Sequence, residues 1–217
     1  QGQVILTTAS GSITDALQND LVNIQSYQGI TLTAGGITSS IGAVDNLFDL
    51  DMGDAATDTL TATAIKGVFL SETDVMRISL VSAVNGDVVL KVVGSIIDVE
   101  AGVGDLDIEG NNITLFAGTG VGAIGNELEI NSGRTTIGSL TVATMLGNIA
   151  LTELSGDLYL NTIGTLTPSA TGAPAPKAFI SAPVGKIIDA RTDANSFNIL
   201  SGQVELFAAQ DIGSSLK

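Results

Sequence analysis

The chain contains no cysteine, no histidine and no tryptophan, and these absences exclude several kinds of chemistry. Without cysteine the protein has no disulfides and no thiolate metal ligands. Without histidine it cannot use a Ser-His-Asp triad or a histidine-ligated zinc ion. We therefore do not expect an enzyme, and we expect no obligatory cofactor.

Basic residues and long apolar runs are scarce as well. The chain has 8 Lys and Arg against 23 Asp and Glu, which gives a net charge of −15. Nucleic acids and anionic membranes require Lys and Arg to neutralise phosphates, so neither is an expected partner. No apolar run approaches the ~20 residues of a membrane helix, so direct membrane insertion is not expected. The first residues, QGQVILTT, do not have the pattern of a signal peptide.

The most informative feature that is present is an internal repeat. The sequence GSIIDV begins at Gly94, and related versions begin at Gly11 and Gly185, at spacings of 83 and 91 residues. Repetition at this scale is typical of stacked repeat architectures. The prediction is one continuous object over 1–217, with repeats at about 2–85, 86–155 and, in part, 185–217. Because the third repeat stops partway, we interpret the chain as an excerpt of a longer protein.

Short alternating segments predict an all-β chain. Phe48, Leu50 and Met52 alternate with Asp49 and Asp51, which is the period of a strand with one buried face. Similar runs recur about every ten residues, separated by Gly, Asn, Asp or Ser. The 26 glycines argue against helices.

Among all-β architectures, a parallel β-helix (β-solenoid) fits best. A propeller blade needs about 40–50 residues and usually carries aromatic signatures, whereas aromatics make up 4% of this chain. At about 20 residues per coil, the chain would form roughly ten coils. We expect Ile, Leu, Val and Ala to form inward ladders, with Asn and Gly at the corners.

All four prolines fall in one segment that interrupts the repeat. Residues 156–160 resemble 86–90, so the next GSIID-like motif is expected at Gly164, yet it appears at Gly185. We interpret 164–184 as an insertion of about one coil, with a Pro-rich loop at 166–178 and a returning strand at 178–182. It is either a tolerated insertion or a recognition loop. The recognition candidates are Pro168, Pro174, Pro176 and Lys177.

The densest acidic cluster is a candidate calcium site, because Ca²⁺ prefers oxygen ligands. Its candidate ligands are Asp49, Asp51, Asp54 and Asp58. The segment departs from the EF-hand pattern, and the repeat 80 residues later does not preserve it: Asp54, for example, becomes Arg134. Calcium at this position would therefore be a local addition to the repeat.

Paired carboxylates could also hydrolyse glycosides. The candidates at outward strand positions are Asp105, Asp107, Glu109, Glu127 and Glu129. Aromatic and basic residues that accompany polysaccharide-cleaving grooves are sparse, so we interpret these carboxylates as a solvated strand face rather than as a catalytic site.

Several segments together resemble the tandem repeats of filamentous-haemagglutinin-like proteins and related giant bacterial adhesins. They are ITLFAG (113–118), IG (124–125), NELEI (126–130), LTV (140–142), GNIALTE (147–153) and GDLYL (156–160). This resemblance covers nearly the whole chain except 166–178. It implies a right-handed parallel β-helix at a bacterial cell surface or outside the cell, acting as a stalk or fibre in attachment. The implied partners are further coils, neighbouring copies in a filament, and surface glycans or proteins. A carbohydrate-binding or carbohydrate-active β-helix and a calcium-stabilised module are the alternatives.

Overall fold

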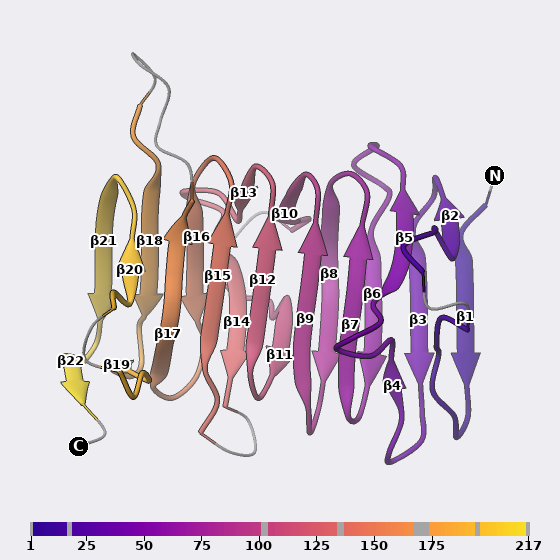
Figure 1. Cartoon of the computed structure of the whole chain (residues 1–217), viewed down its shortest axis with the longest axis horizontal. Helices are drawn as coiled ribbons and strands as arrows, with labels where there is room; N and C mark the ends of the chain where they lie inside the picture. Colours follow the sequence, from indigo (N-terminus) through magenta and orange to yellow (C-terminus); the bar gives the residue numbers. More distant parts are fainter. Residues whose placement is uncertain are drawn as a thin grey trace.

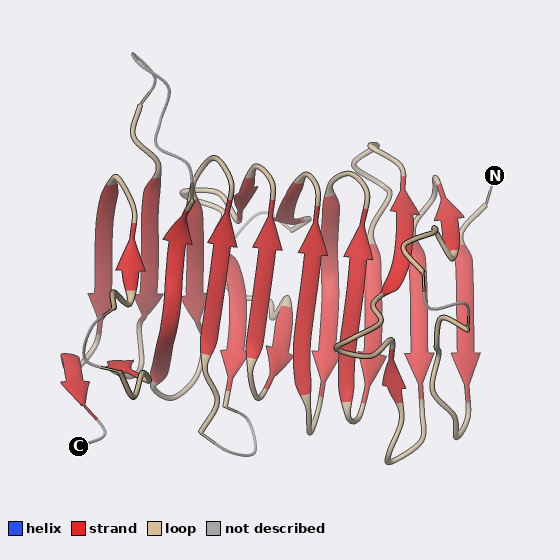
Figure 2. Ribbon diagram, in the orientation of Figure 1, coloured by secondary structure: helices blue, strands red, loops and turns tan. Residues whose placement is uncertain are grey.

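The protein is described by a computed structural model that covers residues 2–16, 19–100, 104–133, 137–166, 174–193 and 196–215. Within these ranges every regular element is a β-strand (Figure 2). The strands form two layers that extend along one axis, with the two termini at opposite ends (Figure 1). No helix in these ranges has the length and apolarity needed to cross a bilayer.

Each layer is one eleven-stranded sheet. Sheet A contains β1 (Val4–Thr8), β3 (Ile30–Ala34), β6 (Leu60–Ala64), β8 (Met76–Ala83), β10 (Ser95–Asp98), β11 (Ile108–Gly110), β13 (Gly120–Val121), β14 (Leu128–Ser132), β16 (Ile149–Glu153), β18 (Lys177–Ala182) and β21 (Gln203–Ala208). Sheet B contains β2 (Ile24–Ser26), β4 (Ser40–Ile41), β5 (Phe48–Met52), β7 (Gly67–Glu72), β9 (Asp87–Val92), β12 (Ile113–Ala117), β15 (Leu140–Thr144), β17 (Leu158–Thr165), β19 (Ile187–Asp189), β20 (Ile199–Leu200) and β22 (Ile212–Ser215).

The pairing pattern confirms the predicted parallel β-solenoid. The chain moves back and forth between the sheets, and strands of successive coils pair in parallel, as β3 does with β6 and β7 with β9. In Figure 1 the sheet B strands β7, β9, β12 and β15 point upward in front of sheet A strands that point downward. The right-handed winding and the ten coils stay predictions.

Inward side chains of successive coils stack into continuous apolar ladders. One ladder in sheet B runs through Phe48, Leu70, Leu90, Leu115 and Val142, all of them buried. Because apolar side chains stack on apolar side chains, each coil covers the apolar face of the coil below it.

The repeated motif contributes to this core, in agreement with the expected inward ladders of Ile, Leu, Val and Ala. Ile13, Ile96 and Ile187 hold the same place in the three copies, and all three are buried in the main apolar cluster. Their side chains therefore explain why the motif recurs.

Successive copies of the repeat lie on opposite sheets. The first copy of the motif joins sheet B, where Ile13 bridges to Ile41; the second, in β10, joins sheet A; the third, in β19, joins sheet B again. Likewise β3 lies in sheet A, its counterpart β12 in sheet B, and β21 in sheet A. One repeat thus contains an odd number of strand passages.

The predicted insertion at 164–184 is described only at 164–166 and 174–184, and residues 167–173 lie outside the described residues. β17 corresponds to β8, since both have eight residues and both carry a register irregularity, against Leu140/Thr141 and Leu60/Thr61 respectively. β18 then corresponds to β9, and eleven residues (166–176) separate β17 from β18 where three (84–86) separate β8 from β9. The likeness of 156–160 to 86–90 reflects a turn-and-strand pattern that many coils share. The predicted return strand at 178–182 lies within β18.

Removing one ladder residue should destabilise the whole solenoid. Leu70 is completely buried, so Leu70→Ala should lower the free energy of unfolding by about 2–5 kcal/mol through lost burial and a residual cavity. The control is Val93→Ala, since Val93 is 70% exposed and should change stability by less than about 0.5 kcal/mol. Urea denaturation followed by circular dichroism measures both, and equal effects would contradict the ladder.

Candidate functional site

The strands of sheet A are interrupted at two neighbouring coils. β10 and β11 both pair with β8, so the chain leaves the sheet after Asp98 and returns before Ile108. In the next coil β13 and β14 both pair with β16, and the chain leaves the sheet between them at 122–127. Because β10 pairs with β13 and β11 with β14, the two interruptions lie side by side.

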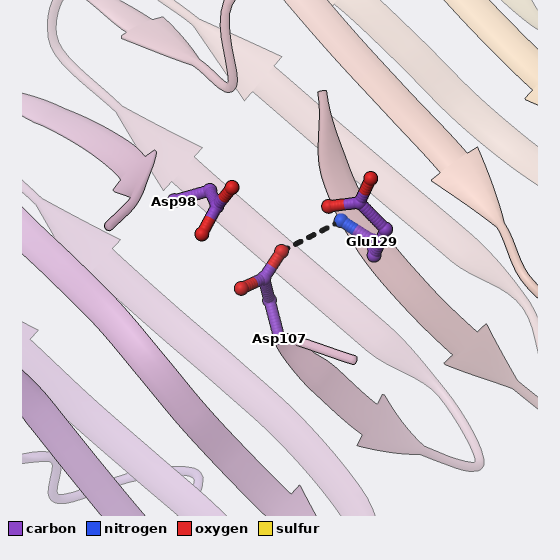
Figure 3. Close-up of side chains that lie close together, drawn as sticks. All are labelled: Asp98, Asp107 and Glu129. Carbon is purple, nitrogen blue, oxygen red and sulfur yellow. Dashed lines mark hydrogen bonds between the residues drawn. The ribbon is translucent and has the colours of Figure 1, made fainter. Parts of the chain in front are cut away.

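Three buried carboxylates meet at this break, and we call them the acidic trio. Asp98 ends β10, Asp107 precedes β11, and Glu129 lies in β14 of the next coil. One oxygen from each lies within 4.8 Å of the others (Figure 3). The residues are 7%, 2% and 1% exposed.

Hydrogen bonds fix two members of the trio but leave the third incomplete. Asp107 Oδ2 accepts the Glu129 backbone N–H at 2.8 Å, and Asp98 Oδ1 accepts the Glu100 N–H at 2.7 Å. The Oε1 atom of Glu129 is buried and has no hydrogen-bond partner among the described residues. A buried oxygen without a partner costs free energy, so this atom marks a place where a ligand would stabilise the protein.

Burial makes it costly to charge all three groups. Loss of hydration raises the pKa of Asp107 to about 8, and repulsion from Asp98 and Glu129 adds to this. Burial also raises the pKa of Glu129, and repulsion from Asp98 adds to this, although a hydrogen bond with the Asp107 carboxyl group lowers it. The trio therefore requires protons or a cation to balance its charge at neutral pH.

The interpretation of a solvated carboxylate face was wrong for four of its five residues. Asp107, Glu109, Glu127 and Glu129 are buried, and Asp105 is exposed. Glu127 accepts the Gly125 N–H at 2.8 Å and Glu109 accepts the Ser82 hydroxyl. Sequence alternation indicates which side chains point away from the core, but it does not reveal the strand breaks that enclose them. Asp98, which lies in the repeated motif, was missed as a site residue.

The four calcium candidates have separate local roles. Asp49 accepts the Ser71 hydroxyl, Asp51 accepts the Gln25 side-chain amide, and Asp58 Oδ2 accepts the Ala55 N–H at 3.0 Å. Asp54 is exposed. Among the described residues, the acidic trio is the group whose ligand oxygens converge as a metal site requires.

Pro176 and Lys177 fasten the base of the Pro-rich segment to sheet A. The Pro176 carbonyl accepts the Ser201 hydroxyl and the Gln203 N–H, both at 2.9 Å. Lys177 pairs with Glu205, and its ammonium lies 5.9 Å from the centre of the Phe179 ring. These contacts hold the described end of the segment against Ser201 and β21. Pro174 lies at the same base, whereas Pro168 lies outside the described residues.

Two further glutamates are buried at inward ladder positions, and they are 81 residues apart. Glu72 pairs with Leu50 and Glu153 with Ile130. The carboxylate of Glu72 accepts the Met52 N–H at 3.1 and 3.2 Å, and that of Glu153 accepts the Ser132 N–H at 3.0 and 3.1 Å. Burial raises their pKa values to about 7 and about 8, although these hydrogen bonds lower them. Each glutamate thus satisfies the last N–H of a strand in the preceding coil.

A groove of about 580 Å³ crosses sheet B, on the other face of the molecule from the trio. The excursion between β4 and β5 borders it, and side chains of β7, β9 and β12 also line it. Asp45 and Lys91 contribute charges, and Phe116, which is 42% exposed, contributes an aromatic ring. This combination of acid, base and ring is one that can hold a polar ligand.

Comparison with known proteins found no family model, no curated protein and no solved structure that matches the chain.

The buried glutamates predict that stability falls as pH rises. In the unfolded chain a glutamate ionises near pH 4.5, whereas Glu153 holds its proton to about pH 8 in the folded protein. Stability should therefore be greatest below pH 4.5 for this group and decrease up to about pH 8, by at most about 1.4 kcal/mol per pH unit. Glu153→Gln should flatten that part of the profile, as measured by thermal unfolding from pH 4 to 9.

The exposed Glu205→Gln variant is the control for this experiment. A Glu153→Gln profile that superimposes on that of Glu205→Gln would show that Glu153 does not carry the effect.

Proposed function

We propose that the chain is a structural module of a secreted or cell-surface bacterial protein, forming a rigid stalk or fibre for attachment or self-assembly. The observation that carries this proposal is an apolar core that reaches both ends of the solenoid. Leu6 pairs with the buried Leu32 and so occupies an inward ladder position, yet it is 39% exposed because it lies in the first coil. At the other end Val204 pairs with the buried Ala178 and is 49% exposed.

The end strands supply hydrogen-bonding groups as well as apolar surface. β1 pairs with β3 on one side and β21 with β18 on one side, and no strand of the described ranges covers their other edges. An open strand edge with apolar inward residues is a template for another parallel strand. Further coils of the same protein, or the end of a neighbouring copy, have the chemistry to complete both ladders.

Charge favours contacts at the ends over contacts along the sides. The net charge of −15 makes parallel shafts repel one another. Backbone pairing and apolar burial at the ends oppose that repulsion only where strands can stack. The expected assembly is therefore a filament one solenoid wide.

End-to-end stacking can be tested by electron microscopy and light scattering over a range of concentrations. The chain should form rods longer than one molecule, and Leu6→Lys combined with Val204→Lys should shift the population to monomers, because a charge at each end opposes stacking. Thr33→Lys, on an outward position of the shaft, is the matched control. Compact monodisperse particles at every concentration, or rods unaffected by the end substitutions, would contradict the proposal.

A second candidate function, glycan binding, is favoured by the groove on sheet B. Carboxylates can accept hydrogen bonds from sugar hydroxyls, and an exposed ring such as that of Phe116 can stack against a sugar face. This function is compatible with a stalk that also attaches to a surface.

A glycan array tests this second candidate. Any glycan that binds should lose about five- to thirtyfold in affinity with Phe116→Ala, since the lost stacking removes roughly 1–2 kcal/mol. Phe197→Ala, at an exposed ring that does not line the groove, is the control and should bind normally. Absence of binding across the array, or equal binding by both variants, would count against the groove as a glycan site.

A further inference from the structure

In all three copies of the repeated motif, an aspartate accepts a backbone N–H where the excursion from the sheet begins. Asp15, Asp98 and Asp189 occupy the fifth position of the motif. Each accepts a nearby backbone N–H: Asp15 from Asn19 at 3.2 Å, Asp98 from Glu100 at 2.7 Å and Asp189 from Arg191 at 2.9 Å. This aspartate is therefore part of the common architecture of the repeat.

The residue that ends each excursion differs among the copies. It is Asn23 in the first copy, Asp107 in the second and Asn198 in the third. Asn23 and Asp107 have the same structural role, since Asn23 Oδ1 accepts the Asp49 N–H at 2.7 Å and Asp107 Oδ2 accepts the Glu129 N–H at 2.8 Å. A carboxylate is therefore not needed for the fold at this position.

The third copy shows what the amide contributes. Asn198 Nδ2 donates to Asp189 Oδ1 at 2.7 Å, so the amide satisfies the aspartate at the start of the excursion. An ionised Asp107 has no donor to offer Asp98. The second copy thus replaces a neutral amide by a buried carboxyl group, which has no donor and carries a negative charge once it ionises.

The described part of the chain supplies no cationic side chain to balance that charge. Its ion pairs join Lys177 to Glu205, Lys186 to Asp211 and Arg191 to Asp193, all outside the trio. The third carboxylate, Glu129, has its buried Oε1 atom without a partner, and Figure 3 shows the three carboxyl groups facing a common space. A cation in that space would satisfy this atom and neutralise the repulsion.

We propose that Asp98, Asp107 and Glu129 bind one divalent cation, and that the cation is Ca²⁺. The ligands are all hard carboxylate oxygens, without nitrogen or sulfur, which matches Ca²⁺ and not zinc or copper. The ion would link Asp98 and Asp107, at the two ends of the excursion, to Glu129 in β14 of the following coil. In the first and third copies the equivalent residues are Asn23 and Asn198, whose side chains make hydrogen bonds at this position. This proposal does not depend on the attachment role.

The full chain should bind Ca²⁺ with a stoichiometry of one in isothermal titration calorimetry. With about 1 mM CaCl2, a concentration suited to extracellular calcium modules, the melting temperature at neutral pH should be higher than with EDTA, because the ion binds the folded state. Mg²⁺ at the same concentration should raise it less, since Mg²⁺ gives up its water reluctantly.

Two variants locate the ion. Asp107→Asn reproduces the asparagine of the other copies, so it should fold, and it should weaken Ca²⁺ binding at least tenfold; Glu129→Gln should do the same. Asp54→Asn removes an exposed acid of the alternative cluster and should leave the calcium response unchanged.

Several results would overturn the assignment. The first is a melting temperature that does not change with Ca²⁺, even if it changes with pH, because the trio would then share protons instead of binding the ion. The second is a Ca²⁺-dependent rise in melting temperature that persists in both Asp107→Asn and Glu129→Gln. The third is the loss of that rise in Asp54→Asn.

Discussion

The structure depends on one constraint, which is that every strand must present to the next coil the same kind of side chain that it receives from the previous one. Parallel pairing places each inward residue directly against the equivalent residue of the next coil, so the ladder from Phe48 to Val142 is apolar throughout. Where a polar group enters an inward position, it must find its partners locally. Glu72 and Glu153 meet that condition by accepting the terminal N–H of a strand in the preceding coil.

Interruptions of the strands are the places where this regular stacking allows variation. In the second and third copies the chain leaves the sheet and returns beside its own start, which brings Asp107 close to Asp98 and Asn198 into contact with Asp189. The three copies keep the aspartate that starts the excursion and vary the residue that ends it, between Asn23, Asp107 and Asn198. A change of amide to carboxylate is small in volume but large in electrostatics.

The odd number of strand passages in each repeat has a consequence for display. It places the acidic trio on sheet A, while the groove with Phe116 and the excursions of the first and third copies lie on sheet B. A longer array of such repeats would therefore present equivalent features on alternating faces. A shaft built this way carries different chemistry on its two sides at any given height.

By itself, the sequence determined the all-β class, the parallel stacking and the burial of Ile13, Ile96 and Ile187, because two-residue alternation and long-range repetition are properties of the chain that survive in any coil. Only the tertiary structure showed that Asp107 and Glu129 are buried beside Asp98, since that follows from two strand breaks lying in register on neighbouring coils. The match of β17 with β8 likewise required the pairing register, because short turn-and-strand sequences resemble one another throughout the chain.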